Sequence, residues 1–151
     1  MTTTLGPIGE TTHGRICRAT LAIETRRPGF TEITGELARF LRQAQAGDGL
    51  LNVFVRHTSA SLTVQENADP DVRTDLMTAL DRLAPRDFGW VHDAEGPDDM
   101  PAHVRTMVTD ASLVLPVAEG RLQLGTWQGI YLIEHRDRPH RRTIVLTYSG
   151  S

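Results

Sequence analysis

Lysine is absent from this sequence, although arginine occurs sixteen times. The absence excludes Schiff-base chemistry on a lysine, and it excludes a phosphate loop of the kind that depends on one. An anionic ligand must therefore be held by arginine, by backbone N–H groups or by a metal ion.

Cysteine and long apolar runs are also scarce. Cys17 is the single cysteine, which excludes an internal disulfide and a multi-cysteine zinc site and fits a cytoplasmic location. No apolar run reaches about 18 residues, so we expect no membrane-spanning helix. Residues 1–10 lack the basic start and apolar centre of a signal peptide. A net charge of −3 gives no general reason to expect nucleic acid or an anionic membrane as partner.

The length of 151 residues, 39% apolar, predicts one globular domain over 1–151 with a leading segment at 1–14. Helical spacing of apolar residues predicts two main helices, at 30–44 and from Asp69-Pro70 to 83. Residues 86–102 read as irregular, followed by a short segment at 103–109. Alternation predicts strands at 15–26, 50–57, 62–65, 111–117, 122–124, 129–135 and 143–148, the last two paired across a loop at 136–142. The fold class is α+β, with a mainly antiparallel sheet or sandwich.

Polar side chains gather first between the second predicted strand and the second helix. His57 ends the strand, Ser59 and Ser61 follow, and Asn67 and Asp69 precede the helix. A helix N-terminus beside hydroxyl and amide groups suits an anion. The alternative is that the serines are turn residues and Asp69 only caps the helix.

A second group occupies the loop from His92 to His103, which holds four carboxylates between its two histidines. Histidine suits zinc and carboxylates suit harder ions such as magnesium, so this loop is a candidate metal site. The spacing matches no standard zinc motif. A solvated acidic loop with two surface histidines is the alternative.

The third group is Trp127-Gln128, which lies between Gly125 and Gly129. Flanking glycines suggest a backbone held close to a ligand or a neighbouring subunit, and the alternative is a β-bulge with a buried tryptophan. The remaining histidines are expected at the surface: His13, His135 and His140. A serine hydrolase triad built on His57 and Ser59 is disfavoured, because it would need a specific geometry on an extended segment.

Together these motifs resemble the YjbQ family, over a stretch from about Arg15 to the C-terminus. The resemblance is carried by His57-Thr58-Ser59-Ala60-Ser61, Glu66-Asn67-Ala68-Asp69-Pro70-Asp71-Val72, Glu95-Gly96-Pro97-Asp98-Asp99-Met100-Pro101-Ala102-His103, Gly120-Arg121-Leu122, Leu124-Gly125-Thr126-Trp127-Gln128-Gly129-Ile130 and Glu134-His135-Arg136-Asp137.

The resemblance implies a compact α+β subunit that forms a homotrimer, with polar pockets near the subunit boundaries. It also implies a secondary thiamine-phosphate synthase activity, which joins a pyrimidine diphosphate to a thiazole phosphate and releases pyrophosphate. Such a substitution needs positive charge on the diphosphate, and a metal ion together with arginine can supply it.

The leading hypothesis is therefore a metal-assisted transferase with a divalent ion, Zn or Mg, and a phosphorylated small molecule as substrate. The catalytic residues would be His57, Asp69 and His103; the metal ligands His57, His92, His103, Asp98 and Asp99; the substrate-binding residues Ser59, Ser61, Asn67, Trp127 and Gln128. The alternative is a non-catalytic trimeric protein that binds a metal ion or a phosphorylated small molecule through the same residues.

Overall fold

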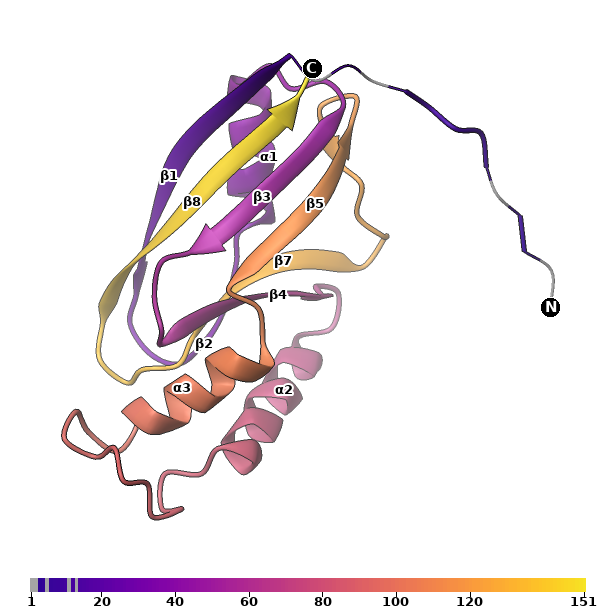
Figure 1. Cartoon of the computed structure of the whole chain (residues 1–151). Coiled ribbons are helices and arrows are strands. Elements are labelled where there is room, and N and C mark those ends of the chain that lie inside the picture. Colours follow the sequence, from indigo (N-terminus) through magenta and orange to yellow (C-terminus); the bar gives the residue numbers. More distant parts are fainter. Residues whose placement is uncertain (1–2, 5, 11, 13) are drawn as a thin grey trace.

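The computed structural model describes residues 3–4, 6–10, 12 and 14–151. Over this part the chain forms two antiparallel sheets and three helices (Figure 1). Their order is β1 (Arg15–Thr25), β2 (Gly29–Glu32), α1 (Thr34–Gln43), β3 (Gly49–Val55), β4 (Ala60–Glu66), α2 (Pro70–Leu83), α3 (Asp99–Val108), β5 (Ser112–Ala118), β6 (Arg121–Leu122), β7 (Gln128–Glu134) and β8 (His140–Gly150).

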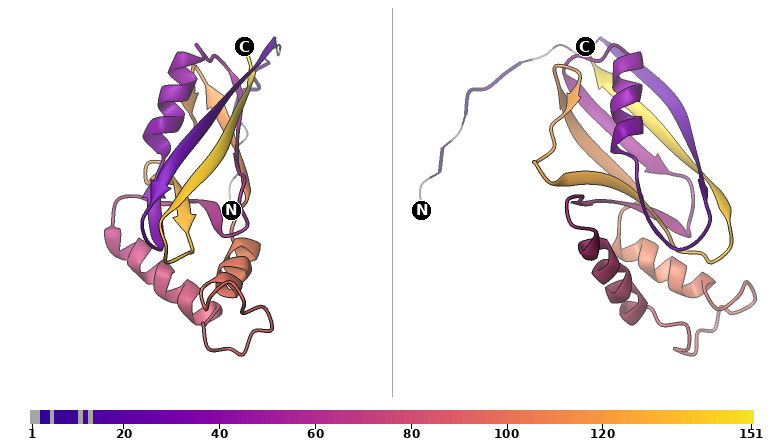
Figure 2. Two further views of the ribbon diagram at one scale, coloured as in Figure 1. Left: turned by 90° about the vertical axis from the view of Figure 1, so that its left-hand side faces the viewer. Right: turned by 180° about the vertical axis from the view of Figure 1, so that it is seen from behind.

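The larger sheet has five strands in the order β1-β8-β3-β5-β6. β1 pairs with β8 along its whole length, from Arg15 opposite Gly150 to Thr25 opposite His140. Side chains alternate between the two faces, so Leu51, Val53 and Val55 of β3 point inward and are buried. The inner face is covered by α1, whereas the outer face carries no helix (Figures 1 and 2).

The smaller sheet has the order β2-β7-β4, with β7 at its centre. The prediction that the strands at 129–135 and 143–148 pair with each other is wrong, because β7 and β8 lie in different sheets. The segment between them carries the chain from one sheet to the other. β7 is buried continuously from Gly129 to Glu134, as expected of a central strand packed on both faces.

α1 packs Leu37, Phe40 and Leu41 into the core against the larger sheet. The helix begins later than predicted, because Phe30 to Glu32 form β2 and pair with β7. Pairing with a sheet edge overrides the helical spacing in these residues.

α2 begins as predicted: the Asp69 carboxylate accepts a hydrogen bond from Asp71 N at 2.9 Å, and Pro70 is the first helical residue. A third helix, α3, was not predicted, and it covers the end of the segment assigned as irregular and most of the short segment at 103–109. α2 and α3 lie side by side at the end of the smaller sheet (Figures 1 and 2). No helix of the described residues is long and apolar enough to cross a membrane.

Candidate metal centre

α3 places two of the predicted metal ligands on one face, one helical turn apart. Asp99 is its first residue and His103 lies four positions later. Asp99 Oδ2 is 3.3 Å from His103 Nε2 and 2.7 Å from His92 Nε2, which comes from the preceding loop. The potential ligand atoms of the three side chains lie within 4.8 Å of one another. These three residues therefore form a compact set of two imidazoles and one carboxylate.

The set is buried at the carboxylate and open at the imidazoles. The Asp99 side chain is 3% exposed, against 45% for His92 and 35% for His103. Burial by itself raises the pKa of Asp99, but the hydrogen bond with His92 and the charge of Arg136 outweigh it and hold the pKa below its ordinary value. Asp99 is therefore anionic at neutral pH and can bind a metal ion, and the exposed imidazoles would leave that ion accessible to small molecules.

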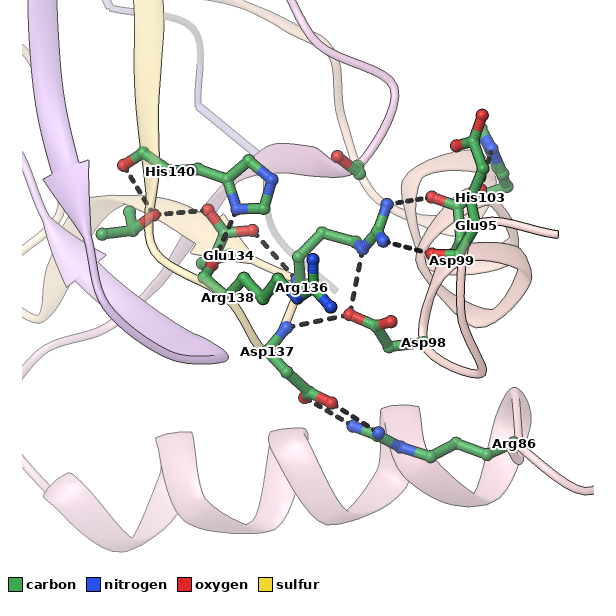
Figure 3. Close-up of polar contacts among 12 residues, drawn as sticks. Arg86, Glu95, Asp98, Asp99, His103, Glu134, Arg136, Asp137, Arg138 and His140 are labelled. Carbon is green, nitrogen blue, oxygen red and sulfur yellow. Dashed lines mark hydrogen bonds and ion pairs between the residues drawn. The ribbon is translucent and has the colours of Figure 1, made fainter. Parts of the chain in front are cut away.

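Arg136, in the loop after β7, holds the other oxygen of the Asp99 carboxylate (Figure 3). The same guanidinium donates from Nε to Asp98 Oδ2 at 2.9 Å and from Nη2 to the Glu95 carbonyl at 2.8 Å. Asp98 also accepts a hydrogen bond from Asp137 N at 2.9 Å. Arg136 thus orients Asp99 Oδ2 toward the histidines. Asp98 binds Arg136 and is not one of the three clustered residues.

His57 lies apart from this cluster in the single chain. Its Nε2 accepts a hydrogen bond from Thr143 N at 2.8 Å, which places the ring proton on Nδ1. Burial and the nearby charge of Arg142 lower its pKa, so the ring is neutral. Nε2 cannot bind a metal while this hydrogen bond is formed. The structure therefore does not bring His57 together with His92 and His103.

Ser59 belongs to a buried ion-pair network beside His57. Arg142 Nη2 donates to the Ser59 carbonyl at 3.2 Å and to its Oγ at 3.0 Å, and the same guanidinium pairs with Glu134. Glu134 also accepts a hydrogen bond from Thr25 at 2.6 Å. In this chain Ser59 contacts an internal arginine, which differs from its predicted role in substrate binding.

Ser61 is also internal, because its Oγ lies 2.8 Å from His135 Nε2 and accepts a hydrogen bond from Thr109 at 2.6 Å. The prediction that His135 lies at the surface is wrong, since it is fully buried at the end of β7. Burial lowers its pKa to about 4. His140 is partly buried and its Nδ1 is 2.7 Å from the Arg138 carbonyl, whereas His13 lies outside the described residues.

The other predicted ligand-binding residues lie at the opposite end of the smaller sheet. Ala60 pairs with Glu134 at one end of β4, and Glu66 pairs with Gln128 at the other. The seven residues of β4 span roughly 20 Å. The Trp127 side chain is 64% exposed, which contradicts a buried tryptophan in a bulge.

Residues of this second group make local hydrogen bonds. Asn67 donates to Glu32 Oε1 at 3.2 Å, Gln128 accepts from Gly125 N at 2.8 Å, and Asp69 caps α2. The single chain therefore separates Asn67, Asp69, Trp127 and Gln128 from the histidine cluster.

The largest cavity described, about 730 Å³, also lies away from the histidines. It is lined by residues of α1, of the β5–β6 turn and of β6, among them Arg42 and Arg121. None of the three clustered ligands borders it, so volume alone does not identify the site.

Arg136 has no role in the predicted site. The signal for it lay in Glu134-His135-Arg136-Asp137, a motif that carries the family resemblance without suggesting a function. Its contacts to Asp98 and Asp99 join segments 37 and 38 positions apart. These contacts exist only because the fold brings the loop after β7 to the start of α3.

Comparison with known proteins supports the resemblance. The family model described as UPF0047 protein YjbQ-like matches residues 19–151. The chain belongs to the YjbQ family. It is 47% identical to UPF0047 protein sll1880 of Synechocystis over 131 residues, covering 86% of this chain and 89% of that protein. It is 44% identical to UPF0047 protein YjbQ of Escherichia coli O157:H7, with coverage of 87% and 96%.

Solved structures of YjbQ relatives share the fold. A conserved hypothetical protein of Thermus thermophilus matches with a TM-score of 0.75 and 38% identity, over 84% of this chain and 97% of that one. An uncharacterised YjbQ/UPF0047 protein of Clostridium acetobutylicum matches with a TM-score of 0.79 and 33% identity, over 86% and 98%. These names carry the family and the fold without stating a reaction.

Proposed function

We propose that this YjbQ protein binds a divalent metal ion through His92, Asp99 and His103, and that the metal centre serves a transferase acting on phosphorylated small molecules. The observation that carries the proposal is the convergence of two imidazole nitrogens on one buried carboxylate oxygen. Two histidines and one carboxylate are the protein ligands of many catalytic zinc sites, which leave a further position open for water or substrate.

The donor set favours a transition metal over magnesium. Magnesium prefers oxygen ligands, whereas imidazole suits zinc and iron. With two half-exposed histidines, the site leaves room for an external ligand. Of the two ions considered, we therefore expect zinc, or a similar transition-metal ion, in place of magnesium.

Electrostatics support a role for the metal with anionic substrates. The cluster contains the Asp99 carboxylate, those of Glu95 and Asp98 lie nearby, and Arg136 is engaged by the two aspartates. A diphosphate would be repelled by this surface unless a divalent cation neutralised it. The reaction that fits is the thiamine-phosphate synthase reaction, in which a carbon of the pyrimidine forms a bond to the thiazole as its bond to the diphosphate breaks and pyrophosphate leaves.

The test is to measure thiamine-phosphate formation by metal-free protein reloaded with Zn²⁺, Fe²⁺ or Mg²⁺. Wild type should require the ion, and His103→Gln should lose at least about tenfold in rate. Asp75→Asn, a change on the exposed surface of α2, is the matched control. An equal rate in His103→Gln and wild type would contradict the proposal. Metal binding without turnover in any sample would favour the non-catalytic binding protein.

The proposal includes a homotrimer in the cytoplasm. The uncovered face of the larger sheet carries exposed apolar side chains of Ile16, Leu50, Phe54 and Val114, which a second copy would remove from water. A shared interface would also allow Asn67 and Trp127 of one subunit to approach the histidines of another. A single cysteine fits a reducing compartment.

A further inference from the structure

A cavity of about 400 Å³ opens beside the proposed metal centre and shares His92 with it. It is formed by the segment between α2 and α3 and the start of α3, a stretch that includes the loop from His92 predicted as a candidate metal site. Its wall includes Trp90, Pro97 and Met100, together with Asp87 and Asp93. A pocket that reaches a potential metal ligand is positioned to hold the organic part of a substrate.

Two contacts hold the aromatic residue of the cavity wall in place. Trp90 is partly buried and its indole N–H donates to the Pro85 carbonyl at 2.8 Å. The Phe88 ring packs against it with centroids 4.5 Å apart and planes at 36°. Met100 adds a polarisable thioether to the same pocket. A rigid aromatic surface beside a thioether suits a flat ring.

The polar part of the cavity is negatively charged. The Asp87 and Asp93 side chains are exposed, and neither has an ion-pair or hydrogen-bond partner within the part of the chain that the structure describes. Arg86 also borders the cavity, but its guanidinium pairs with the Asp137 carboxylate through two hydrogen bonds of 2.6 Å (Figure 3). Arg86 is therefore not available to an anion, and the charge that remains is that of the two aspartates.

We propose that this cavity binds a flat aromatic ring that carries an amine or another cationic group. The ring would stack on Trp90, and the amine would bind Asp87 and Asp93. Both the negative charge of the aspartates and the face of the indole ring attract a cation. A substrate bound in this way has its far end at His92. The orientation of the substrate toward His92 rests on the proposed function, whereas binding of the ring rests on the cavity alone.

The chain offers a direct readout, because Trp90 and Trp127 are its two tryptophans. Trp127 is exposed and directly precedes β7, so Trp127→Phe leaves Trp90 as the single tryptophan fluorophore. The probes are benzylamine, benzoate and cyclohexylmethylamine. They separate the effects of charge and aromaticity, since the second is aromatic but anionic and the third is cationic but aliphatic.

Benzylamine should change Trp90 fluorescence and bind at least about tenfold more tightly than either of the other probes. Changing both Asp87 and Asp93 to Asn should weaken it at least about fivefold, whereas Asp75→Asn on α2 should leave it unchanged. Benzoate binding as tightly as benzylamine, or a Trp90 signal that responds to none of the probes, would overturn the proposal.

Zinc binding measured on the same samples separates the two proposals. A benzylamine response in protein that binds no zinc contradicts the metal centre and supports the pocket. Zinc binding with no benzylamine response supports the metal centre and contradicts the pocket.

Discussion

The histidines that the structure describes lie in different electrostatic environments, and His135 has the largest shift in pKa. It is fully buried beside Ser61, and burial together with the charge of Arg105 lowers its pKa to about 4. The folded state therefore keeps His135 neutral, while the unfolded chain protonates a histidine near pH 6.5. Between these values the unfolded state binds more protons, so stability falls as the pH falls from about 6.5 and levels off below about 4.

As the pH falls from 7.5 to 4.5, we expect the titration of His135 to lower the free energy of unfolding by about 2.5 kcal/mol. His135→Gln, which keeps a hydrogen-bonding group for Ser61, should flatten most of that slope in urea unfolding curves. A smaller slope from His57 should remain, since its pKa is also lowered. An unchanged slope in His135→Gln would show that burial does not control this titration.

At the scale of elements, two arginine–aspartate pairs tie the loops beside α3 to the rest of the fold. Arg136 is 16% exposed and contacts Asp98 and Asp99, which are 11% and 3% exposed. Arg86 and Asp137 are 44% and 45% exposed. Removing one partner of a buried pair leaves an uncompensated charge, whereas an exposed pair is screened by water.

Arg136→Gln should therefore destabilise the protein by about 3 kcal/mol and weaken metal binding, because Asp99 loses the group that orients it. Arg86→Gln should change stability by less than about 1 kcal/mol. Urea denaturation and zinc titration of both variants provide the measurements. Equal effects of the two changes would contradict a special role for the Arg136 contacts.

Local elements follow from the sequence more readily than their partners do. Asp69-Pro70 predicts the start of α2 because a cap and a fixed backbone angle act within a few residues. The pairing of β7 is not predictable in this way. β2 and β4 are its partners, and the strand that follows it in the chain lies in the other sheet. α3 was missed because Asp98 precedes it and its first three residues include Asp99 and Pro101, a composition that also suits a loop.

The same limit applies to the candidate site. The loop from His92 to His103 stands out in the sequence through its histidines and carboxylates, and the structure gathers three of them. His57 and Ser61 stand out equally, but their partners are Thr143 and His135, about 80 positions away. Local composition cannot show that such residues have internal partners.

At the scale of the whole molecule, the uncovered sheet face is the feature that one chain leaves unexplained. Four large apolar side chains on it are between 44% and 62% exposed. Assembly would bury them, and it would offer the polar residues at the far end of β4 a route to the histidines of a neighbour. A homotrimer is the assembly that we propose.

Light scattering after size exclusion should give a mass of about 50 kDa for wild type, three chains of 16.7 kDa. Phe54→Glu should shift the mass toward 16.7 kDa, since a charge on the outer face opposes burial. Thr31→Glu, on the exposed side of β2, should not shift it. A monomeric wild type would contradict this assembly.

The most direct test of the account is zinc titration of metal-free protein by calorimetry. Wild type and His57→Gln should each bind one ion per chain with the same affinity, because His57 Nε2 accepts a hydrogen bond from Thr143 N. His103→Gln should bind at least about 100-fold more weakly. Loss of binding in His57→Gln, with binding retained in His103→Gln, would contradict a metal centre built from His92, Asp99 and His103.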